Sequence, residues 1–243
     1  ITLMKEPDAT HLDLHKLRID RAMALEIIRI GVPAGLQGMA FSLSNVVVQS
    51  SINSFDSSVI VAGNSASNNI ENFVYIGMSA FTQACITFTS QNVGAQNLKR
   101  VKSIFNHSMV LTTLSAMLMG FLVWFFGESL LAFYTSDPAV VEAGMLRLFW
   151  VSMFLFLNGI LDVFVSSLRG MGYSSLPTIV MLVGICGVRL LWLLLIFPMH
   201  RTLTTIYLCF PLSWTVTSIV LGFIWLYCYR HMLRTNGQQA QNA

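Results

Sequence analysis

The chain alternates between long apolar runs and short polar breaks. A helix that crosses a bilayer needs about 20 mainly apolar residues, because each residue adds about 1.5 Å across a hydrocarbon layer of about 30 Å. Six runs are long enough, and the breaks between them carry charges or turn-forming residues. The predicted spans lie near 27–51, 59–89, 103–126, 144–168, 175–198 and 203–229. This pattern predicts an all-α, polytopic membrane protein with six transmembrane helices.

The polar segments divide the rest of the chain. We expect residues 1–24 to form a cytoplasmic connector between two larger pieces, residues 25–230 to form the transmembrane lobe, and residues 231–243 to form a cytoplasmic tail. The break after Phe126 contains "ESLLAFYTSDP", which predicts a short interfacial helix that ends at Pro138.

Composition supports a membrane protein and excludes a soluble domain. The chain has 243 residues, of which 55% are hydrophobic and only 10% charged, with a mean hydropathy of +0.67. Soluble domains carry about 25% charged residues, which supply the polar shell that this chain lacks. All four cysteines lie inside apolar runs, so we expect small core residues and no disulfide or metal site.

Basic residues predict the orientation, since cytoplasmic loops are enriched in lysine and arginine. Eleven of the 14 basic residues fall on the side of both termini: Lys5, Lys16, Arg18, Arg21, Arg29, Lys99, Arg100, Lys102, Arg169, Arg230 and Arg234. Only Arg147 and Arg201 fall in the opposite loops, and Arg189 lies within the fifth span. Both termini are therefore predicted to be cytoplasmic, and the net charge of +3 reflects topology and does not indicate nucleic-acid binding.

Polar residues repeat at helical spacing inside three spans. Those that recur every three or four residues share one helix face, and the candidates for a cavity are Asn45 and Gln49, Asn64, Asn68, Glu71, Asn72 and Tyr75, and Asn158 and Asp162. Lipid cannot satisfy such groups, so each stripe faces another helix or a water-filled cavity. For the amides taken singly, interhelical hydrogen bonds are the better interpretation. Glu71 and Asp162 are the acids deep within spans, and ionisable residues there suggest a functional site.

Two arginines need separate interpretations. Arg169 lies at the end of the fourth span, where it can reach the headgroups or cap the helix. Arg189 lies deeper, so we expect an ion pair with an acidic partner, for which Asp162 and Glu71 are the candidates.

Three segments in order carry a family resemblance: "RIGVPAGLQGMAFSLSNVVVQSSINSF", "AFTQACITFTSQNVGAQNLKRV" and "LDVFVSSLRGMGYSSLPTI". Over residues 20–230 the chain resembles the second half of a MATE (multidrug and toxic compound extrusion) transporter. The resemblance implies one lobe of a twelve-helix antiporter that takes in Na⁺ or H⁺ and exports organic, often cationic, compounds. We expect a plasma membrane location (the inner membrane in a bacterium). The sequence has no HExxH or GxSxG motif and no paired acids in a loop, so we expect neither enzymatic activity nor a cofactor. A transported Na⁺ would be the only metal.

The resemblance also refines the candidate site. Asp162 and Glu71 match the tenth and eighth helices, where family members often carry acidic cation-site residues, whereas the seventh helix offers Gln37 and Asn45 but no acid in its core. The partner would be a missing N-terminal lobe or a second copy of this chain. The alternatives are a lipid-linked oligosaccharide flippase of the wider superfamily and a non-transporting membrane scaffold whose polar stripes only hold helices together.

Overall fold

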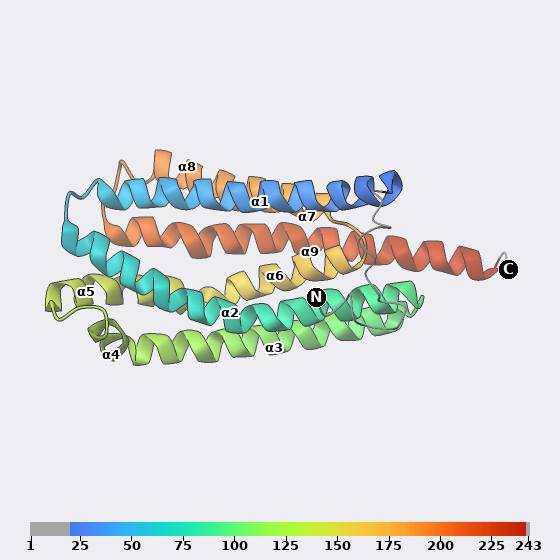
Figure 1. Cartoon of the computed structure of the whole chain (residues 1–243), viewed down its shortest axis with the longest axis horizontal. Coiled ribbons are helices and arrows are strands. Elements are labelled where there is room, and N and C mark those ends of the chain that lie inside the picture. Colours follow the sequence, from blue (N-terminus) through green and yellow to red (C-terminus); the bar gives the residue numbers. More distant parts are fainter. Residues whose placement is uncertain (1–19, 242–243) are drawn as a thin grey trace, which may run out of the picture.

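The computed structural model describes residues 20–241, without the side chains of residues 26, 30, 33, 34, 37, 40 and 235–241. The described residues are helical almost throughout, and the helices run nearly side by side (Figure 1). The elements are α1 (Arg21–Asn53), α2 (Ser58–Gly94), α3 (Leu98–Phe125), α4 (Gly127–Ala132), α5 (Pro138–Arg147), η2 (Leu148–Ser152), α6 (Leu155–Gly170), α7 (Ser175–Met181), η3 (Leu182–Gly187), α8 (Val188–Leu195) and α9 (Leu203–Gln241). The η elements are π-helical.

These elements form six long rods, because α5–η2–α6 and α7–η3–α8 each continue as one helix. Four rods among the described residues are long and apolar enough to cross a membrane: Leu98–Phe125, Pro138–Gly170, Ser175–Leu195 and Leu203–Arg234. The predicted all-helical, polytopic membrane fold is therefore confirmed. The count of six crossings stays a prediction, since α2 in particular carries a long polar stripe.

Side-chain caps define several helix starts. Asp20 accepts hydrogen bonds from the amides of Ala22 and Met23 at the start of α1. Asp137 caps α5, whose first residue is Pro138. The prediction that Pro138 ends a preceding helix is therefore wrong, since α4 already ends at Ala132. Proline suits the first helical position because its missing N–H is one that has no intrahelical partner there.

The ends of the predicted lobe are only partly described. Most of the predicted connector lies outside the described residues, and α1 begins at Arg21. The predicted tail from residue 231 continues α9 as far as Gln241.

The helices pack as two groups that meet at α9. α2, α3 and α6 pack against one another, with α5 against α2, whereas α1 packs mainly against α7, η3 and α8 (Figure 1). Trp225 anchors α9 to the first group: its ring stacks 3.9 Å from that of Phe105 on α3, and its indole donates to Ser167 on α6 at 2.8 Å. Cys85, Cys186, Cys209 and Cys228 are all buried, which confirms their predicted place in the core. α1 and α2 touch little, and this leaves space between them.

Candidate functional site

A cavity of about 750 Å³ lies between the two helix groups. This volume falls within the range of about 300–1,000 Å³ that is typical of small-molecule sites. Nine of the predicted site residues line it: Asn45, Gln49, Asn68, Glu71, Asn72, Tyr75, Asn158, Asp162 and Arg189. The side chain of Gln37 lies outside the described residues. The polar stripes of three helices thus line one cavity, whereas their spacing left open whether each faces another helix or a cavity.

Glu71 on α2 forms a buried ion pair with Arg147, the last residue of α5. Arg147 Nε donates to Glu71 Oε1 at 3.0 Å, and Nη2 donates to Oε2 at 2.7 Å. Both residues are buried, with exposed fractions of 7% for Glu71 and 5% for Arg147. Two parallel charge-assisted bonds of this kind fix geometry as well as charge.

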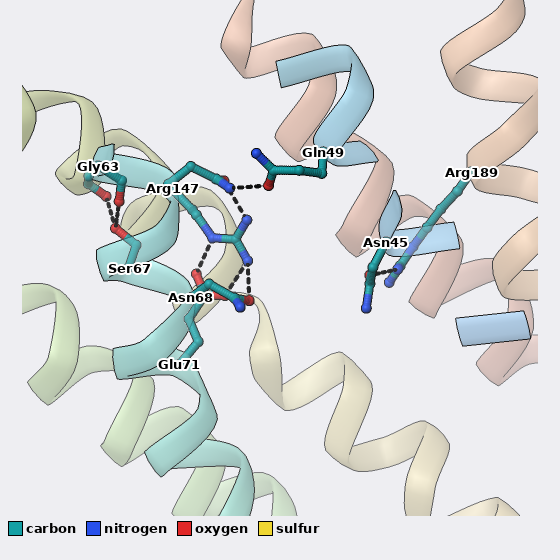
Figure 2. A network of polar contacts seen from close by, with 10 residues as sticks. Asn45, Gln49, Gly63, Ser67, Asn68, Glu71, Arg147 and Arg189 are labelled. Carbon is teal, nitrogen blue, oxygen red and sulfur yellow. Dashed lines mark hydrogen bonds and ion pairs between the residues drawn. The ribbon is translucent and has the colours of Figure 1, made fainter. Parts of the chain in front are cut away.

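Two asparagines complete the surroundings of Arg147 and extend the network to α1 (Figure 2). Its Nη1 donates to Asn64 Oδ1 at 2.6 Å, and its Nη2 also donates to Asn68 Oδ1 at 3.0 Å. The Asn64 amide in turn donates to Gln49 Oε1 at 2.9 Å. The ion pair between α5 and α2 is therefore linked to α1 through the uncharged side chains of Asn64 and Gln49.

Small residues allow α5 to approach α2 closely enough for this pair. A Cβ on Gly63 would lie 2.7 Å from the Val140 carbonyl oxygen and 2.8 Å from the Gly144 nitrogen, both backbone atoms. Ser67 strengthens the contact, since its hydroxyl lies 2.9 Å from the carbonyl oxygens of both Gly63 and Gly144 (Figure 2). We refer to Gly63, Ser67 and Gly144 as the small-residue contact.

The placement of Arg147 in an external loop was wrong, because this arginine is buried in the lobe. α5 runs from Pro138 to Arg147 and continues into η2 and α6, so Arg147 lies within this rod and not in the turn before it. The sequence carried a partial signal, since Arg147 falls inside the apolar run predicted at 144–168. Its distance of 11 residues from Asn158 (158 − 147) is about three α-helical turns, but η2 lies between the two residues, so this spacing alone does not establish a shared face.

Asp162 is half-buried on α6 and faces the cavity. The amide of Asn158, one turn earlier, donates to Asp162 Oδ2 at 3.2 Å. Tyr75 of α2 is a second hydrogen-bonding neighbour, and Arg169 is the positive charge that acts on this carboxylate. Arg169 also lines the cavity, although its position in the sequence suggested a headgroup contact or a helix cap.

Arg189 on α8 is buried, with 3% of its surface exposed, and makes only neutral contacts among the described residues. Its Nε donates to Ser213 Oγ at 3.2 Å, and its Nη1 donates to Asn45 Oδ1 at 3.4 Å. Its guanidinium carbon lies 4.3 Å from the centre of the Phe210 ring. The predicted ion pair of Arg189 with an acid is therefore wrong here, because Arg147 holds Glu71, and Asp162 lies beside Arg169.

Both buried arginines lie next to π-helical turns. Arg147 directly precedes η2, and Arg189 is the second residue after η3. Short π-helical segments occur within α-helices mostly at functional sites. They also change the angle between residues on either side, so the 3.6-residue period does not predict which side chains share a face across them.

An all-helical membrane fold with a polar cavity among its helices is consistent with a secondary transporter, whose sites are held by side chains and helix ends within the membrane. The MatE family profile matches residues 33–194, which is most of the chain. The chain belongs to this family, whose members are membrane transporters and not enzymes.

Individual relatives support this assignment. The chain is 26% identical over 165 residues to the probable multidrug resistance protein NorM of Thermotoga maritima, a match that covers 68% of this chain and 35% of that protein. It is 26% identical over 139 residues to the FAD transporter of Shewanella oneidensis, covering 56% and 29% of the two chains.

A solved structure shows the same fold. The crystal structure of MATE in complex with MaL6 superposes with a TM-score of 0.82 at 15% identity, over 96% of this chain and 53% of that one. The chain thus spans about a third of the length of the curated relatives that it matches and about half of that solved chain.

Proposed function

We propose that this chain forms one lobe of a cation-coupled antiporter that exports amphipathic organic compounds through the cavity between α1, α2, α6 and α9. The observation that carries the proposal is the position of Asp162, half-buried in the wall of a polar cavity of about 750 Å³. A carboxylate that water can reach at membrane depth can release and rebind H⁺ or hold Na⁺. Membership of the MatE family supports the same role.

The two acids then have different roles. Glu71 is held by two bonds from Arg147, so its charge is matched within the protein. Asp162 accepts from the neutral amide of Asn158 and has Tyr75 and Arg169 as neighbours, but it is only half-buried, so water or a cation can reach it from the cavity. We assign ion coupling to Asp162 and the alignment of α2 with α5 to Glu71.

The cavity walls fit an amphipathic compound. Phe41, Phe210 and Trp214 offer aromatic surface, while the amides of Asn68 and Asn72 offer hydrogen-bonding groups. The NorM relative of Thermotoga maritima is named as a probable multidrug resistance protein, which agrees with a site of this type. The two acids within the spans predicted a preference for organic cations. Glu71 is paired with Arg147, so this preference now depends on Asp162 alone.

The lobe needs a partner to close the cavity. We propose that an N-terminal lobe or a second copy of the chain faces it, and that the two rock against each other around the bound solute. The excess of basic residues on the side of both termini supports cytoplasmic termini, and the plasma membrane is the proposed location.

Replacing Asp162 tests the proposal in the complete protein that contains this chain. Asp162→Asn preserves the shape of the side chain but removes its charge, so ethidium efflux driven by a Na⁺ or H⁺ gradient should fall about tenfold or more. Glu142→Gln is the matched control, since Glu142 is an exposed acid that does not line the cavity.

Unchanged efflux in the Asp162→Asn protein would refute the coupling role and would favour a scaffold whose polar residues only join helices. An unmodified protein that exports no ethidium under either gradient would favour the lipid-linked oligosaccharide flippase.

A further inference from the structure

The charges that line the cavity do not balance within the described part of the chain. Two acids, Glu71 and Asp162, face three arginines, Arg147, Arg169 and Arg189. Glu71 is paired with Arg147, and Asp162 lies beside Arg169 on the same helix. Among the described residues, Arg189 is left with neutral contacts alone, so the wall at α8 carries an unmatched positive charge.

The contacts of Arg189 orient its side chain without neutralising it. The Ser213 hydroxyl accepts from Nε at 3.2 Å while it donates to the Phe210 carbonyl oxygen at 2.8 Å. The Asn45 carbonyl oxygen accepts from Nη1 at 3.4 Å, a long hydrogen bond, and no bond of Nη2 is found among the described residues. The guanidinium therefore has donor capacity left, and Arg189 is one of the residues that line the cavity.

An aromatic surface lies directly under this guanidinium. The Phe210 ring centre is 4.3 Å from the Arg189 guanidinium carbon and 5.6 Å from that of Arg147, so one ring faces both cations. Trp214, one turn further along α9, meets Phe210 edge to face at 5.8 Å and also lines the cavity. A cation over a ring is stabilised by the ring quadrupole, which does not supply a full negative charge.

Burying a guanidinium without an anion is costly, because the charge loses its hydration and gains only dipoles in return. The planar fork of arginine matches a carboxylate or phosphate group, which accepts two parallel bonds. An anion that enters the cavity would compensate the charge and use the free donors.

We propose that Arg189, with Phe210 and Trp214 beside it, is the subsite for the carboxylate or phosphate group of an aromatic organic anion. This inference rests on the proposed function in one respect, which is that solutes enter this cavity. It adds that the substrate class is an aromatic organic anion. The solute places its anionic group on Arg189 and its ring system against the aromatic side chains of α9.

Binding of FMN and riboflavin tests this subsite, since the two share one ring system and differ by one phosphate ester. Affinities are measured by fluorescence anisotropy on the complete protein in lipid nanodiscs, without an ion gradient. The unmodified protein should bind FMN about tenfold or more tightly than riboflavin, because a charge-assisted bond to a buried group has that effect. Arg189→Gln should make the two affinities equal.

Two further variants separate the subsite from general effects. Arg189→Lys retains the positive charge but lacks the planar guanidinium fork, so part of the preference for FMN should remain. This variant tests the subsite even if Arg189→Gln fails to fold. Arg201→Gln is the matched control, because Arg201 is exposed and does not line the cavity. The Arg201→Gln protein should prefer FMN over riboflavin as strongly as the unmodified protein does.

Equal affinities of the unmodified protein for FMN and riboflavin would overturn the proposal and would indicate that the charge of Arg189 is matched by an acid outside this chain. A preference for FMN that persists in Arg189→Gln would overturn it as well. Neither result depends on efflux, so a failure of this inference is distinguishable from a failure of the coupling role of Asp162.

Discussion

The two buried arginines of the lobe, Arg147 and Arg189, share nearly everything except a counter-charge. Both are almost fully buried, both lie next to a π-helical segment, and both contact the ring of Phe210. Arg147 donates two hydrogen bonds to the Glu71 carboxylate and one each to the amide oxygens of Asn64 and Asn68. Arg189 donates to the Ser213 hydroxyl at 3.2 Å and to the Asn45 amide oxygen at 3.4 Å, and Figure 2 shows the bond to Asn45.

The packing around each arginine explains this difference. The small-residue contact brings α5 against α2, so that Arg147 reaches Glu71 directly. α8 lies against α1 and α9, whose side chains at that level are Asn45 and Ser213. One arginine therefore fixes helices in place, and the other presents its charge to the cavity. Burial alone does not distinguish a structural arginine from a binding one, whereas the counter-charge does.

Removing the carboxylate from the first arginine should have the largest effect on stability. Glu71→Gln leaves Arg147 buried without an anion, and breaking a buried ion pair in this way costs about 3–5 kcal/mol of unfolding free energy. The measurement is unfolding of the complete protein by SDS titration in mixed micelles.

The double variant Glu71→Gln with Arg147→Gln is the control, because it removes both charges and should regain a large part of the loss. A Glu71→Gln protein as stable as the unmodified one would show that Arg147 does not depend on this carboxylate, and the contrast between the two arginines would disappear.

An intermediate effect on the unfolding free energy is expected at the close contact between α5 and α2. Gly63→Ala places a Cβ against backbone atoms of Val140 and Gly144, which cannot move as a side chain can, so α5 must shift away from α2. Overpacking of this kind costs about 1–3 kcal/mol. The same SDS titration measures the change.

Gly77→Ala on the same helix is the matched control, since its Cβ would meet only the Met119 methyl at 3.8 Å. Equal stability of the two variants would contradict the view that the small-residue contact positions Arg147.

Much of the fold was predictable because local pattern determines it. Apolar runs of sufficient length became long helices, and the third, predicted at 103–126, is Leu98–Phe125 in the structure. The stripes on three helices were predicted to face either another helix or a cavity, and in the structure they line one cavity. Lipid cannot satisfy amides, so polar groups at helical spacing must gather inside a bundle.

The pairing of charges was not predictable from the same pattern. Arg147 and Glu71 are 76 residues apart and meet only because glycines allow α5 to approach α2. The count of basic residues that predicted the topology also assigned Arg147 to a loop. Such a count does not consider whether a basic residue lies on a helix or which face of the helix it occupies. The π-helical turns beside both arginines interrupt the 3.6-residue period on which such a face is predicted.

The smallest effect on stability should come from Arg189→Gln, which sharpens the comparison most. The amide nitrogen of glutamine lies where Nε lies in arginine, so it can still donate to Ser213 but is too short to reach Asn45. The loss of the cation over Phe210, worth about 0.5–2 kcal/mol, is offset by relief from burying an unmatched charge. We expect the unfolding free energy to change by less than about 1 kcal/mol, well below the change for Glu71→Gln. A loss of about 3 kcal/mol or more in the SDS titration would mean that a carboxylate outside the described residues holds Arg189. It would then be structural like Arg147 and unable to bind a solute anion.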